Sequence, residues 1–79
     1  MKEWSEIKVA IEQAITDGHR DLSAIARRAH ELLRPDSPGD SDRITLCLYR
    51  HLLDMVADDK IAISRKDGEL WITDLKERR

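Results

Sequence analysis

The sequence predicts a mostly helical α+β fold in which three helices are followed by a C-terminal β-hairpin. Apolar residues recur every three or four positions in three segments before position 58, which is the period of amphipathic helices. Between positions 60 and 73, apolar and polar residues alternate on either side of Asp67-Gly68, a pair favoured in two-residue hairpin turns. The 79 residues match the size of one small domain, spanning 1–79.

Composition and charge narrow the functional classes. Hydrophobic residues make up 41% and charged residues 38% of the chain, which is typical of a globular domain rather than a disordered one. No apolar run approaches the roughly 18 residues that span a bilayer, and the first residues lack the apolar core of a signal peptide. We therefore expect a cytoplasmic protein that does not contact membranes. The formal net charge of −2 weakens the case for DNA binding without excluding it, because phosphate neutralisation favours basic proteins.

The first helix is expected at about residues 4–16. Its inward stripe consists of Trp4, Ile7, Ala10, Ile11, Ala14 and Ile15. Ser5 is the expected cap, and Gly18 is expected to end the helix in a left-handed conformation.

The second helix is expected at about residues 22–33, with Asp21 as its N-cap. Its inward stripe consists of Leu22, Ile25, Ala26, Ala29, Leu32 and Leu33. Arg27 and Arg28 lie on the opposite face, where they are either solvated charges or contacts to phosphate.

Residues 34–40 contain two prolines and a glycine, so a loop without regular structure is expected there. Its aspartates lack the other ligands of an EF-hand calcium loop. The single Cys47 and the three scattered histidines do not fit the spacing of a zinc site. The sequence therefore predicts no metal and no cofactor.

The third helix is expected at about residues 42–57, capped by Ser41 or Asp42. Spacing residues at about 100° around the helix directs Ile44, Leu48, Leu52 and Met55 inward. The opposite side carries Leu46, Tyr49, Arg50, Leu53 and Ala57, flanked by Arg43 and Asp54.

The hairpin is expected at residues 60–73, with Ser64 facing Trp71 and Ile63 facing Ile72. In that register Ile61, Ile63, Leu70 and Ile72 share the core face, and Trp71 lies on the other face. Arg65 and Lys66 form a basic tip beside the turn. The tail comprises 74–79, and its last four residues, 76–79, are expected to fray.

The segment from Leu48-Tyr49-Arg50-His51-Leu52 to Ile61, together with the pair Ile25-Ala26, resembles the winged helix-turn-helix superfamily. Asp59 departs from the pattern, because many members carry glycine there. The resemblance implies a brief strand near residues 19–21 that pairs with the wing. It also implies that the third helix enters the DNA major groove while the wing contacts phosphate or the minor groove. The positions implied to meet DNA are Arg27, Arg28, Arg43, Thr45, Tyr49, Arg50, Arg65 and Lys66.

Two functional hypotheses remain open, and neither is an enzyme, because the chain lacks a glycine-rich phosphate loop and a nucleophile–base pair. The first is a small DNA-binding transcriptional regulator or DNA-associated accessory factor. The second is an acidic protein-interaction module, an adaptor or inhibitor. Its candidate contact residues are Leu46, Tyr49, Leu53, Ala57 and Trp71. A homodimer is compatible with both. In a third alternative, the third helix is buried on both sides, between the first helix and the sheet, and exposes no apolar surface to a partner.

Overall fold

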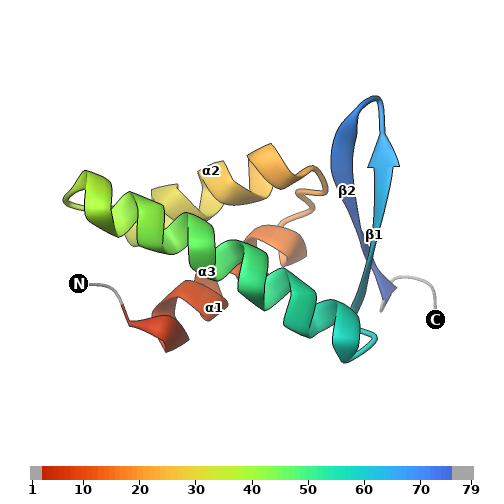
Figure 1. Cartoon of the computed structure of the whole chain (residues 1–79), viewed down its shortest axis with the longest axis horizontal. Helices are drawn as coiled ribbons and strands as arrows, with labels where there is room; N and C mark the ends of the chain where they lie inside the picture. Colours follow the sequence, from red (N-terminus) through yellow and green to blue (C-terminus); the bar gives the residue numbers. More distant parts are fainter. Residues whose placement is uncertain (1–2, 76–79) are drawn as a thin grey trace.

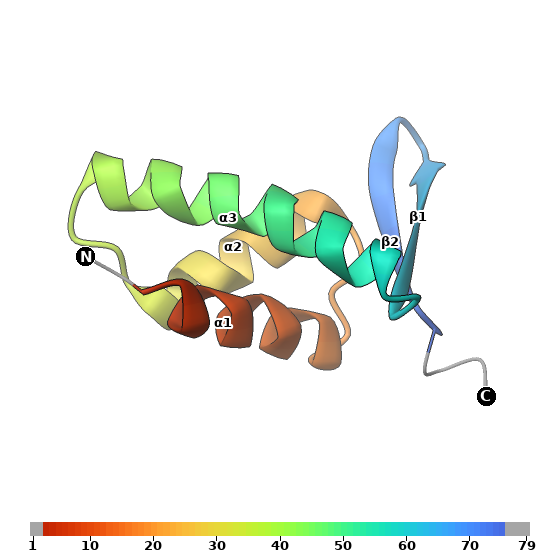
Figure 2. The ribbon, with the colours of Figure 1, turned by 60° about the horizontal axis from the view of Figure 1, so that its bottom comes forward.

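The computed structural model describes residues 3–75 and confirms the expected order of three helices and a hairpin (Figure 1). The helices are α1 (Trp4–Thr16), α2 (Leu22–Leu33) and α3 (Pro38–Ala57), and the antiparallel strands are β1 (Ile61–Lys66) and β2 (Glu69–Asp74). Helices α1 and α3 run in the same general direction, with α2 returning beside them (Figure 2). None of the helices in the described region has the length and hydrophobicity to span a bilayer. Positions 76–79 of the expected tail lie outside the described residues.

One hydrophobic core joins the three helices to the base of the hairpin. The buried apolar residues are Ile7, Ala10, Ile11, Ala14, Ile15, Ile25, Ala29, Leu33, Ile44, Leu48, Leu52, Met55, Ile61 and Ile72. Trp4, Leu22 and Ala26 are only half-buried at its edge. The expectation for Leu32 was wrong, because its side chain is 40% exposed near the end of α2.

Local capping explains where the first two helices begin and end. Asp21 caps α2 as expected, since its carboxylate accepts a hydrogen bond from the Ala24 N–H at 2.7 Å. Gly18 takes the expected left-handed conformation, with φ of 102°. The expected cap Ser5 was wrong, because Glu3 is the N-cap of α1 and its N–H donates to Glu6 Oε2 at 3.3 Å. The pair is a capping box, in which the two residues satisfy each other's exposed backbone groups.

Helix α3 begins at Pro38, four residues earlier than expected, so the loop is shorter than 34–40. Ser37, rather than Ser41 or Asp42, is its cap, and the Ser37 hydroxyl accepts a hydrogen bond from the Asp40 N–H at 3.2 Å. A proline is favourable in the first turn because its missing N–H has no helical partner there and its φ already suits a helix. The prediction that residues 38–40 belong to a loop, made from their proline and glycine, was therefore wrong.

The hairpin has the expected register and turn. Asp67 and Gly68 have φ of 54° and 83°, as a type I′ turn requires, and Ser64 pairs with Trp71. The expected brief strand is present as a bridge between Asp21 and Trp71. It is reinforced by a hydrogen bond from the Ile72 N–H to the Arg20 carbonyl at 2.6 Å. The base of the hairpin is thereby fastened to the start of α2.

The prediction of four core-facing residues in the hairpin is correct for two of them. Ile61 and Ile72 are buried, whereas Ile63 is 37% exposed and Leu70 is half-buried. The reason is that the outer half of the hairpin extends past the helices (Figure 1). Asp59, where glycine was noted as usual, takes the left-handed conformation itself, with φ of 57°.

Candidate interaction surface on helix α3

The outer face of α3 carries three large apolar side chains in contact with solvent. Leu46 is 71% exposed, Tyr49 48% and Leu53 65%. Their spacing of three and four residues places them on one line along the helix, and the exposed Ala57 continues that line. We call Leu46, Tyr49, Leu53 and Ala57 the α3 stripe. The alternative in which α3 is buried on both sides is therefore wrong.

The stripe faces outward because the opposite side of α3 is fully used by the core. Ile44, Leu48 and Leu52 are all at most 2% exposed. A hydrogen-bonded histidine also holds α3 to α2. His30 Nδ1 contacts the Ala26 carbonyl at 2.7 Å and His30 Nε2 contacts the Ser41 hydroxyl at 2.9 Å. Rotation of α3 to hide the stripe would expose these core residues and break the contact between His30 and Ser41.

Charges of both signs border the stripe. Arg50 is exposed beside Tyr49, and Asp54 follows Leu53. Arg43 is exposed one turn before Leu46. Over its whole length α3 carries three aspartates and two arginines, so its surface is mixed in sign rather than a positive band.

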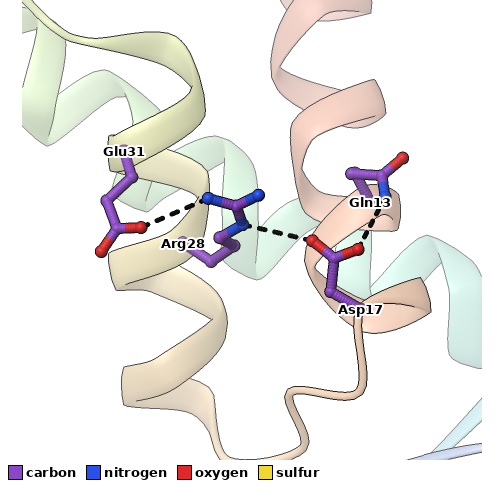
Figure 3. A network of polar contacts seen from close by, with 4 residues as sticks. All are labelled: Gln13, Asp17, Arg28 and Glu31. Atoms are coloured by element: carbon purple, nitrogen blue, oxygen red, sulfur yellow. Dashed lines mark hydrogen bonds and ion pairs between the residues drawn. The ribbon is translucent and has the colours of Figure 1, made fainter.

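Arg28, one of the positions implied to meet DNA, belongs to an ion-pair network (Figure 3). Its guanidinium contacts Asp17 at 3.2 Å and Glu31 at 3.4 Å. The Asp17 carboxylate raises the pKa of Arg28. The pKa of Asp17 is lowered by hydrogen bonds from the Gln13 amide, at 2.8 Å, and then from Arg28. Arg28 therefore faces two carboxylates, one of them on the turn after α1, which reduces its attraction for phosphate.

The other implied DNA positions are divided between the helices and the hairpin. Arg27 is exposed on α2, while Arg43, Tyr49 and Arg50 are exposed on α3. The Thr45 hydroxyl donates to the Ser41 carbonyl of its own helix at 3.1 Å. Its proton therefore already has an acceptor within the chain.

Arg65 and Lys66 are exposed at the outer end of β1, as expected for a basic tip. The Lys66 ammonium lies 4.4 Å from the centre of the Trp71 ring. Trp71 is half-buried on the hairpin face opposite Ile61 and Ile72. The structure thus places Trp71 with the hairpin cations and not in the α3 stripe.

His51 is a buried polar residue that the sequence analysis did not single out. Its side chain lies between α3 and α1, with Nε2 3.5 Å from a Glu12 carboxylate oxygen and its ring packed edge-on to Trp4. Neither ring nitrogen has a hydrogen-bond partner among residues 3–75. Burial lowers the pKa of His51, and the nearby Glu12 carboxylate offsets part of that effect. His51 follows Ile44 by seven residues, so helical periodicity could have identified it as inward-facing.

A second apolar surface lies between α1 and α2. It is an open groove of about 470 Å³ lined by Ser5, Glu6, Val9, Ala10, Gln13, Leu32 and Leu33. The described region contains no cluster of three or more side chains suited to hold a metal ion.

No family model, curated protein or solved structure matches this chain. The functional argument therefore depends on the surface chemistry of the chain itself.

Proposed function

We propose that this protein is a protein-interaction module whose α3 stripe binds a partner. The observation that carries the proposal is the exposure of Leu46, Tyr49 and Leu53 on one line of a helix whose other side is already packed. Full burial of one such side chain contributes about 1.5–3 kcal/mol. A contiguous exposed apolar strip on a small domain commonly marks a binding surface.

The chemistry of α3 supports a protein partner more than a DNA groove. A helix that reads the major groove presents hydrogen-bonding side chains to base edges, whereas the centre of this face is occupied by Leu46 and Leu53. Aspartates outnumber arginines along α3, which opposes approach to phosphate. Arg28 and Thr45 already have partners within the chain.

Photo-crosslinking tests this proposal directly. A photoreactive phenylalanine analogue is placed at Leu46 or Leu53, and at the exposed Thr16 of α1 as the control. After irradiation in the source cells, we expect a discrete protein adduct from both α3 positions and none from the control. The substitution Leu53→Glu should abolish the adduct formed at position 46 while the far-UV circular dichroism stays helical. Absence of a protein adduct at both α3 positions, or adducts with nucleic acid alone, would contradict the proposal.

The second candidate function is DNA binding, which is favoured by exposed Arg27, Arg50, Arg65 and Lys66. If these four cations contact phosphates, the logarithm of affinity should fall with the logarithm of salt concentration with a slope of about −3 to −4. A mobility-shift titration on mixed-sequence duplex measures this slope. The double variant Arg65→Ala, Lys66→Ala should reduce it by about 2. No retardation at tens of micromolar protein in low salt would eliminate this candidate.

A further inference from the structure

We propose that His51 is a two-position switch, which packs against Trp4 between α1 and α3 while neutral and turns outward into a charged cleft when protonated. The cleft lies beside His51 between the same two helices and has a volume of about 430 Å³. We call it the α1–α3 cleft. None of its lining residues belongs to the α3 stripe, so the inference goes beyond the proposed function.

The packed position leaves the imidazole without polar partners. His51 is 7% exposed, and neither of its ring nitrogens forms a hydrogen bond within residues 3–75. Its Nε2 lies 3.5 Å from a Glu12 carboxylate oxygen, which exceeds the usual length of a hydrogen bond. A buried polar group without a partner destabilises the conformation that buries it. A second position with polar partners can therefore compete with the packed one.

Aromatic packing holds the neutral ring in place. The His51 ring lies edge-on to Trp4, with the ring centres 6.0 Å apart, and such edge-on pairs are favourable. The Lys8 ammonium lies 5.5 Å from the centre of the same Trp4 ring. Burial lowers the pKa of His51, so the imidazole is neutral near pH 7 and the packed position dominates there.

Charges from both helices and from the segment after α3 surround the imidazole. The charged residues that line the α1–α3 cleft with His51 are Lys8 and Glu12 of α1, Asp54 of α3, and Asp58 and Lys60 beyond it. Burial lowers the pKa of His51, Glu12 and Asp54 raise it, and Lys8 lowers it. The three carboxylates outnumber the two ammonium groups, so the cleft attracts an imidazolium that enters it.

The two aspartates lie where an outward-turned imidazolium can approach them. Asp54 follows His51 by three residues and Asp58 by seven, which places all three on one side of the helix. Both aspartates are exposed. Mild acid charges an imidazole before it discharges carboxylates. The protonated ring therefore gains charged partners and water in the cleft, whereas the packed position would bury its charge.

The expected movement is local. Ile7 and Ile11 are fully buried in the core, so they keep α1 in place when His51 leaves Trp4. The movement thus releases only the first turn of α1, at Trp4, from α3. Because one proton is bound, the ratio of outward to packed rings should rise by at most about tenfold for each pH unit.

Proton NMR of the unmodified chain from pH 7.5 to 4.5, well below its Tm, tests the switch. The His51 ring resonances should titrate with a midpoint below pH 6.5. The nuclear Overhauser contact between the His51 ring and the Trp4 indole should disappear across the same midpoint. Far-UV circular dichroism should stay helical throughout. Trp71 is the internal control, because its indole lies on the hairpin beside Lys66 and should not follow this midpoint.

A double variant, Asp54→Asn with Asp58→Asn, tests the outward position. It should lower the midpoint by about 0.3 pH unit or more, because the imidazolium loses two carboxylate partners. Asp42→Asn is the matched control, since Asp42 is exposed on α3 outside the cleft, and it should leave the midpoint unchanged.

Four results would overturn the inference. The His51 ring stays neutral down to pH 4.5, or its contact with Trp4 persists after the ring has titrated. The contact disappears only together with the helical signal, which would indicate unfolding of the domain instead of a local movement. The double aspartate variant leaves the midpoint where it is in the unmodified chain.

Discussion

The substitution Ile72→Ala should destabilise the whole domain, because Ile72 joins the hairpin to the helices. Its side chain is fully buried in the core, and its N–H donates to the Arg20 carbonyl at 2.6 Å. Truncation of a buried isoleucine to alanine costs about 2–5 kcal/mol. A single core in a domain this small rarely supplies more than about 3–5 kcal/mol. The variant should therefore lose about two-fifths or more of its free energy of unfolding, with a fall in Tm of about 8 °C or more.

Ile63→Ala is the matched control, because Ile63 is the cross-strand partner of Ile72 on the same hairpin face. Its side chain is 37% exposed, so its truncation should cost about 1 kcal/mol or less. Thermal and urea unfolding followed by far-UV circular dichroism measure both effects. Equal shifts in the two variants, or a helical transition unaffected by Ile72→Ala, would refute the reasoning. Equal shifts would mean that burial does not separate the two isoleucines, and an unaffected helical transition would mean that the helices do not depend on the hairpin for their core.

Three further predictions address the caps, the turn and the buried histidine. Ser37→Ala should cost about 1 kcal/mol and accelerate hydrogen exchange of the Asp40 amide. Gly68→Ala should cost about 1–2 kcal/mol because the turn needs positive φ, seen as a lower urea midpoint. Because burial depresses the pKa of His51 below 6.5, the unfolded state binds more protons below that pH. Stability should therefore fall as pH drops through 6.5 toward the lower folded pKa. Thermal scans across that range should show His51→Leu losing this component, while His19→Gln retains it.

The elements were largely predictable because their signals are local. The apolar periods of α1 and α2, the Asp21 cap and the Asp67-Gly68 turn each depend on neighbouring residues, and the structure contains all of them. The start of α3 was missed because Pro38 and Gly39 are usual in loops. The feature that distinguishes a capped first turn from a loop is the hydrogen bond that the Ser37 hydroxyl accepts from the Asp40 N–H, and the sequence does not show it.

The surface was less predictable because exposure depends on distant parts of the chain. Periodicity located Leu46, Tyr49 and Leu53 on one side of a helix, but not whether another element would cover that side. Likewise, the position of Arg28 on its own helix cannot show that its guanidinium contacts Asp17, because that carboxylate belongs to the turn after a different helix. Such pairings arise from tertiary packing, which local sequence patterns do not encode.

The exposure of the α3 stripe also constrains the kind of assembly that this surface can form. An apolar surface that docks onto a different patch of the next copy generates open chains of molecules. A two-fold pair instead buries the same stripe on both copies and leaves none of it to recruit a third. The hairpin edge is protected separately, because Arg65 and Lys66 place charges at the outer end of β1 and charged edge strands resist further pairing. Of these two surfaces, the α3 stripe with its exposed Leu46 and Leu53 is therefore the one that favours association.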